Sequence, residues 1–128
     1  MEVEAKAIFG FEAVMSYIKE MDCFHDYRTG GFDYEGDTVS ICIEEDWPLD
    51  EIKDYDGPVW KLDLIGLSSF RFGLDTALGF WVREIVCGDK PNEIVIDLEN
   101  GIILATAKEL RISLIKPGKG EGQVYFPT

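Results

Sequence analysis

The chain has 128 residues, of which 46% are hydrophobic and 29% are charged. This composition excludes an intrinsically disordered chain, and the length predicts a single domain over residues 1–128. The 25 acidic residues outnumber the 12 basic ones, so the formal net charge is −13. A field of this sign repels phosphate backbones and anionic lipids, so neither nucleic acid nor a membrane is an expected partner.

The sequence shows neither a membrane span nor a secretion signal. No apolar run approaches the roughly 20 residues that cross a bilayer. The acidic start MEVEAKAIFGF lacks the basic residues and long apolar run of a signal peptide, so a cytoplasmic location is expected. The odd number of widely spaced cysteines, Cys23, Cys42 and Cys87, argues against a disulfide framework and predicts buried, reduced thiols.

The first predicted element is an amphipathic helix over about residues 9–21. Phe11, Val14, Met15 and Ile18 have the i, i+3, i+4, i+7 spacing that places them on one stripe of a helix. A single helix of this length needs a partner surface for its apolar stripe. We therefore expect it to cover an open face or end of a sheet.

From Asp26 onward the apolar residues recur with a period of two, which is typical of strands with one buried face. The alternation is clear in the segments DTVSICIEE, VWKLDLIG, EIVIDL and LRISLI. It is looser in GFWVREIVCG, which favours a strand covered on both faces, with a short helix as the alternative. SSFRFGL is expected to form a short separate strand, because Gly66 interrupts the pattern before it.

Turn residues predict two hairpins. Asn100-Gly101 lies between two apolar runs and predicts a type I′ turn that pairs residues 93–98 with residues 102–107. Glycines around residues 30–31 and 35–37 place two further paired strands near 26–34 and 38–44.

One helix and about seven strands joined by short turns predict a mainly β (α+β) fold. The expected architecture is a curled antiparallel sheet, half-barrel or sandwich with one N-terminal helix and strands over about residues 26–116. The glycine-rich residues 117–128 are expected to form a loose C-terminal tail whose last residues dock back on the body.

His25 is the only histidine of the chain, and Asp26 follows it directly. Neighbours on a strand point to opposite faces, so no side-chain contact between the two is expected. No G-x-S-x-G elbow is present. A structural role at the junction of helix and sheet is therefore favoured over catalysis, and no catalytic residue is predicted.

The triplet Phe24-His25-Asp26, just before the first predicted strand, supplies a family resemblance. It is similar to the opening of several families of small, acidic, β-rich bacterial domains of unknown function, which we call FHD-type domains. Some of these are assigned as immunity proteins of polymorphic toxin systems. The resemblance covers the triplet and the run of strands after it. It implies that Phe24, His25 and Asp26 are structural signature residues, and it brings no established catalytic residues.

Residues 44–57, EEDWPLDEIKDYDG, form the densest charged segment. Its carboxylates would steer a basic protein to the surface, and exposed aromatic residues among them would anchor that protein. The alternative is a solvated loop without a binding role. The predicted partner-binding residues are Glu44, Glu45, Asp46, Trp47, Asp50, Glu51, Asp54, Tyr55 and Asp56. The segment does not meet the EF-hand pattern, so neither a metal nor a cofactor is predicted.

These patterns favour a non-enzymatic binding protein, and the first concrete form is an immunity-type inhibitor of a basic protein toxin. The alternative is a small-molecule-binding protein or an unrecognised enzyme that uses the interior of the sheet, which an unfilled interior would support. Core packing is the expected role of the aromatic residues Trp60, Phe70, Phe72, Phe80 and Trp81.

Overall fold

The computed structural model describes residues 6–45, 58–74, 81–99, 101–116 and 126. The elements in chain order are β1 (Lys6–Phe9), α1 (Phe11–Glu20), the 3-10 turn η1 (Asp22–Phe24), β2 (Tyr27–Glu35), β3 (Thr38–Glu45), β4 (Val59–Leu74), β5 (Val82–Cys87), β6 (Glu93–Leu98) and β7 (Gly101–Lys116). The predicted mainly β fold with one N-terminal helix is confirmed.

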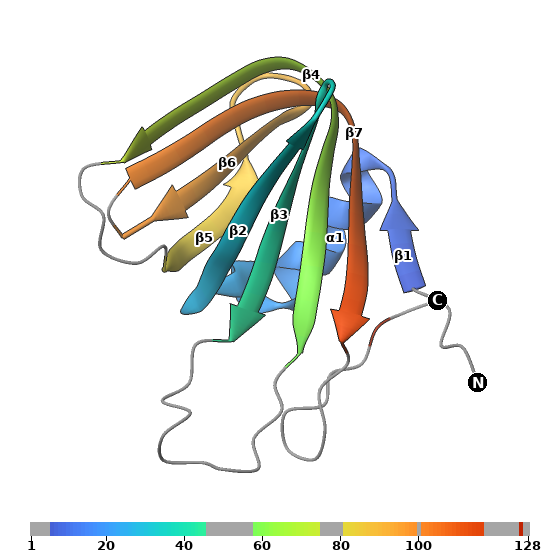
Figure 1. Cartoon of the computed structure of the whole chain (residues 1–128), viewed down its shortest axis with the longest axis vertical. Coiled ribbons are helices and arrows are strands. Elements are labelled where there is room, and N and C mark those ends of the chain that lie inside the picture. Colours follow the sequence, from blue (N-terminus) through green and yellow to red (C-terminus); the bar gives the residue numbers. More distant parts are fainter. Residues whose placement is uncertain (1–5, 46–57, 75–80, 100, 117–125, 127–128) are drawn as a thin grey trace.

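All strand pairs are antiparallel, and the order across the sheet is β2-β3-β4-β7-β6-β5. The two 16-residue strands β4 and β7 pair along most of their length and curve together over the molecule (Figure 1). The first half of β7 pairs with β6 on its other edge, and the second half pairs with β1. At one end β2 and β5 meet through a bridge between Arg28 and Trp81, so the sheet is nearly closed and barrel-like.

The continuity of β4 corrects the prediction that Gly66 separates two strands. Gly66 has a φ of +68°, and the register shifts by one residue between Leu67 and Ser69, so the strand bends without ending. A glycine in the left-handed region next to a bulge allows this bend because it has no Cβ to clash. Likewise, residues 102–107 and 110–115 belong to one strand, β7.

The strand pairing of both predicted hairpins is confirmed, whereas Asn100 of the predicted type I′ turn lies outside the described residues. β6 pairs with the start of β7 from Glu93↔Thr106 to Leu98↔Gly101, one residue from the expected register. β2 and β3 join through a tight turn at Gly36 and Asp37, where Gly36 has a φ of +62°. GFWVREIVCG contains the strand β5, but the expectation that both faces of this strand are covered is wrong, because Arg83, Glu84 and Cys87 are exposed. Strand β1 was not predicted.

Large apolar side chains fill the interior of the sheet at the described positions. Those exposed by at most 2% include Val39, Ile41, Ile43, Trp60, Leu62, Leu64, Ile94, Ile96, Leu98, Ile103, Leu110 and Ile112. Trp60 packs edge-on against Phe24, with 4.9 Å between ring centroids, and its indole N–H donates to the Tyr17 hydroxyl at 2.9 Å. The filled interior gives no support to a ligand site at these positions.

Helix α1 packs against β7, β5 and β1. It covers residues 11–20, so it is slightly shorter at both ends than the predicted helix over about residues 9–21. Val14, Tyr17 and Ile18 are buried, whereas Phe11 and Met15 of the predicted stripe are only half-buried. Phe126 is buried and meets the Tyr17 ring edge-on at 5.0 Å, which confirms that the end of the tail docks on the body.

A buried carboxylate connects three strands on the outer face of the sheet. Asp63 on β4 is 1% exposed and accepts hydrogen bonds from the Ser40 hydroxyl on β3 and from Arg111 Nε on β7, at 2.5 and 2.7 Å. The Lys61 ammonium lies 3.7 Å away. Because its oxygens have partners on both neighbouring strands, Asp63 helps to fix the register of β3, β4 and β7.

Two burial predictions were wrong. The three cysteines are free, as expected, but Cys87 at the end of β5 is exposed, and Cys23 and Cys42 are half-buried. Trp60 is fully buried and Phe70 half-buried, yet Trp81 is 38% exposed. Trp81 precedes Val82, whose side chain points inward, so Trp81 lies on the outer face. Phe80 and the side chain of Phe72 lie outside the described residues.

Candidate functional site

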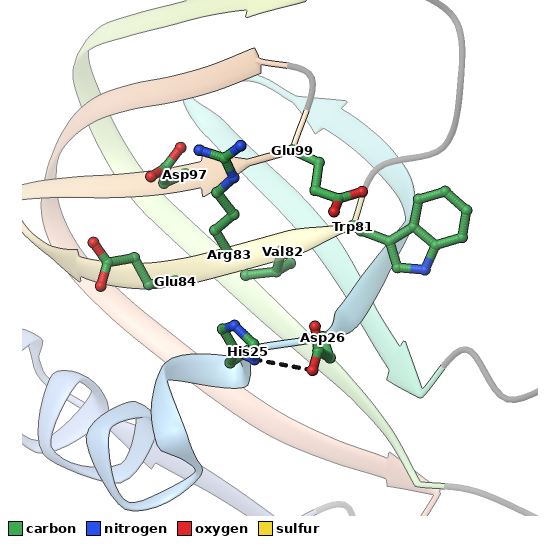
Figure 2. Close-up of a pocket in the computed structure, with 8 residues that line it drawn as sticks. All are labelled: His25, Asp26, Trp81, Val82, Arg83, Glu84, Asp97 and Glu99. Carbon is green, nitrogen blue, oxygen red and sulfur yellow. Dashed lines mark ion pairs between the residues drawn. The ribbon is translucent and has the colours of Figure 1, made fainter.

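A polar hollow of about 720 Å³ lies where β2 and β5 meet, and we call it the seam hollow (Figure 2). It is lined by His25, Asp26, Trp81, Val82, Arg83, Glu84, Asp97 and Glu99. The residues come from the turn after η1, from β5 and from the end of β6, so the hollow exists only because the sheet curls closed.

The side chains of His25 and Asp26 are in contact, with 3.0 Å between His25 Nδ1 and Asp26 Oδ2. This contact corrects the expectation that the two side chains point apart. That expectation assumed a strand, but His25 directly follows η1 and Asp26 has a φ of +68°, so the backbone turns at these residues. The Asp26 N–H donates to the Val82 carbonyl at 3.0 Å, which holds the turn against β5.

A bulge in β5 brings carboxylates together. The register with β6 shifts between Val82 and Glu84, so the side chains of both Arg83 and Glu84 are exposed. Glu84 then lies directly opposite Asp97 of β6. One step along, the Glu99 N–H donates to the Trp81 carbonyl at 2.9 Å and extends the ladder to the exposed indole.

The charges of the seam hollow do not balance. Four carboxylates, Asp26, Glu84, Asp97 and Glu99, face one guanidinium, Arg83, and one imidazole. Carboxylates directly opposite each other on paired strands destabilise a sheet, so we expect the Glu84–Asp97 pair to lower the stability of the free protein. Such a local cost is typical of a functional site.

The chemistry open to these groups is mainly recognition. Asp26 can orient the imidazole through Nδ1 and leave Nε2 as a base. However, the described residues that line the hollow include no hydroxyl, thiol or amine nucleophile. Carboxylates beside an exposed indole instead suit a cationic side chain together with its apolar stem. Among the described residues no group of three or more potential ligands is placed to hold a metal ion.

Most of the predicted partner-binding residues, Asp46, Trp47, Asp50, Glu51, Asp54, Tyr55 and Asp56, lie outside the described residues, as does the side chain of Glu45. Glu44 is described. Its Oε1 lies 4.0 Å from Arg28 Nε, and Arg28 bridges to Trp81 across the seam. Glu44 is thus two strands, or about 10 Å, from the rim of the seam hollow.

Of the FHD triplet, Phe24 is a core residue and the other two are surface residues. Phe24 is fully buried and contacts the rings of Trp60 and Tyr27. The sequence patterns missed Trp81, Arg83, Glu84, Asp97 and Glu99 as site residues. A signal was present, because the predicted strands around Arg83 and Asp97 carry charged residues on their outer positions, but only their pairing shows that these charges meet.

No family model matches the chain, and neither a curated protein nor a solved structure matches it. The resemblance to FHD-type domains therefore stays a prediction. The helices that the structure describes are too short to pass through a lipid bilayer.

Proposed function

We propose that this chain is a non-enzymatic binding protein that engages a basic protein through an acidic face centred on the seam hollow. The observation that carries the proposal is the pair of opposed carboxylates, Glu84 and Asp97, in the same hollow as the exposed Trp81. A lysine or arginine of the partner would neutralise this pair, and the indole would supply an apolar anchor.

The face extends beyond the hollow itself. Glu44 lies two strands from Trp81, so its carboxylate can act on the same partner as the carboxylates of the seam hollow. With a net charge of −13, the protein would attract a basic partner at long range, and the association rate would fall as salt rises.

The concrete form of the proposal is an immunity-type inhibitor of a basic protein toxin. Two observations support it. The carboxylates of the acidic face can take the place of the anionic substrate that a basic nuclease binds, and the sequence resembles FHD-type domains. A binding protein of this kind needs an exposed acidic face and no catalytic group of its own.

Affinity capture from the source organism's lysate at low salt tests the binding surface. Three baits are compared: the wild type, a site variant E84Q/D97N/E99Q, and a control variant E20Q/E35Q/E109Q. The control alters three exposed carboxylates outside the hollow, so the two variants have the same net charge. We expect a basic protein to be retained by the wild type and the control and to be lost from the site variant.

Equal loss from both variants would show that net charge alone drives binding, and equal retention would place the interface elsewhere. As a second measurement, the free site variant should be more stable than the control variant by about 0.2–1 kcal/mol, because it removes the opposed carboxylates. Co-expression of the captured protein with and without this chain then tests inhibition. If the captured protein is not toxic, the proposal of a toxin inhibitor is wrong, whereas the proposal of a binding surface still holds.

A further inference from the structure

A second hollow, of about 750 Å³, lies between helix α1 and strand β5, and we call it the α1–β5 groove. One wall is a stripe of the helix that contains Phe11, Met15 and Lys19. The other is formed by Ile85, Val86 and the turn that carries Lys90. None of these residues lines the seam hollow.

The floor of the groove is apolar surface that the fold leaves incompletely covered. Phe11 and Met15 belong to the same helical stripe as Val14 and Ile18, which are fully buried, yet both are only half-buried. Val86 on β5 is also half-buried. A ligand with an apolar body would remove this surface from water, and methionine adapts readily to the shape of such a body.

The far wall is preformed by backbone hydrogen bonds. The Gly88 N–H donates to the Glu93 carbonyl at 2.8 Å, and the Glu93 N–H donates to the Lys90 carbonyl at 3.2 Å. The Ala107 N–H donates to the Asn92 carbonyl at 3.1 Å and ties the turn to β7. Because this wall is held in place, a ligand would not have to order it on binding.

The described residues that line the groove carry more positive than negative charge, although the net charge of the chain is negative. Lys19 and Lys90 stand on opposite walls, and Glu12 is the one carboxylate among the lining residues that the structure describes. Within the described part of the chain, neither lysine has a carboxylate oxygen within 4.0 Å of its ammonium. In a protein with a net charge of −13, two ammonium groups beside an apolar floor complement a ligand that is both apolar and anionic.

We propose that the α1–β5 groove binds an amphipathic anion, a linear alkyl chain that ends in a carboxylate. The alkyl chain would lie on Phe11, Met15 and Val86, and the carboxylate would be held between Lys19 and Lys90. This site is separate from the acidic face and does not depend on its function.

The groove contains its own reporter, because the exposed Cys87 lines it whereas Cys42 lies on β3, outside it. Iodoacetamide alkylation of the full chain is followed at each cysteine by peptide mass spectrometry, with and without sodium dodecanoate below its micelle concentration. We expect dodecanoate to slow alkylation of Cys87 at least fivefold and to leave Cys42 unchanged. Equal protection by the dodecyltrimethylammonium cation, or none by dodecanoate, would overturn the proposal.

Calorimetric titration with dodecanoate tests the two lysines. K19Q/K90Q should weaken binding about tenfold, since two exposed ion pairs are lost. The charge-matched control R71Q/K108Q changes two exposed cations outside the groove and should bind as the wild type does. Equal weakening in both variants, or none in K19Q/K90Q, would show that the lysines do not hold the carboxylate.

Discussion

The hydrogen bond between Trp60 and Tyr17 gives the sharpest prediction about the core. Tyr17→Phe removes the hydroxyl that accepts the Trp60 N–H at 2.9 Å and leaves this donor in a site where Trp60 is 0% exposed. An unpaired buried donor costs about 1–3 kcal/mol. For a chain of 128 residues this corresponds to a fall in Tm of about 4–11 °C.

Denaturant unfolding and calorimetry of the wild type, Y17F and the control Y34F measure this loss. Tyr34 is 67% exposed, so the same chemical change there should cost less than about 0.5 kcal/mol. A double-mutant cycle with Trp60→Phe should give a coupling energy of about 1 kcal/mol. If Y17F were no less stable than Y34F, or if the cycle gave no coupling, the hydrogen bond would not be stabilising and the reasoning would be refuted.

The same hydroxyl predicts a dependence on alkaline pH. Burial raises the pKa of Tyr17 above its ordinary value. Between the unfolded pKa, about 10, and the higher folded pKa, the unfolded chain loses this proton while the folded chain keeps it, so stability falls as pH rises. The advantage of the wild type over Y17F should therefore shrink above pH 10, by up to about 1.4 kcal/mol per pH unit. A constant difference from pH 8 to pH 11 would contradict the raised pKa.

Three further predictions concern other parts of the fold. Asp63→Asn should lower the free energy of unfolding by about 1.5–3 kcal/mol, because a buried carboxylate loses charge-assisted hydrogen bonds; a loss below 0.5 kcal/mol in urea unfolding would contradict this. Gly66→Ala should lower the free energy of unfolding by about 1–3 kcal/mol, because its φ is +68° and a Cβ there would lie 3.0 Å from the Lys108 side chain. Gly73→Ala is the control, since open space surrounds Gly73, and it should change stability little. Equal losses in both variants would show that residue 66 is not strained by a side chain. Cys87 should be alkylated faster than Cys23 at pH 8, because Cys87 is exposed and burial raises the pKa of the Cys23 thiol. Peptide mapping that finds Cys23 alkylated before Cys87 would contradict this prediction.

The hairpins and the helix could be predicted because their signals are local. A tight turn at Gly36 and the Asn100-Gly101 pair each lie between alternating segments, so neighbouring residues alone indicate the pairing. The long strands could not be predicted in the same way. Gly66 reads as a break in isolation, and only the continuous pairing of β4 with β7 shows that it is a bend.

The candidate site depended even more on tertiary structure. Arg83 and Glu84 are adjacent in sequence, and alternation would place them on opposite faces, but the bulge exposes both. The contact between His25 and Asp26 depends on a positive φ at Asp26, which no residue pattern indicated. The acidic segment was predicted to bind a partner because of its charge, and of its residues the structure places Glu44 two strands from Trp81.

The pairing of β1 with the far half of β7 has a consequence for how the protein folds during synthesis. Lys6 lies opposite Leu114, and Ile8 lies opposite Ile112, so the pairing of β1 requires that β7 has already been synthesised. Closing a loop of that size is entropically costly, and folds with such distant pairings are slow to form. During synthesis β1 has no strand to pair with, and the helix that follows it lacks part of its docking surface, until β7 has emerged from the ribosome, so the native sheet cannot be completed before β7 is made.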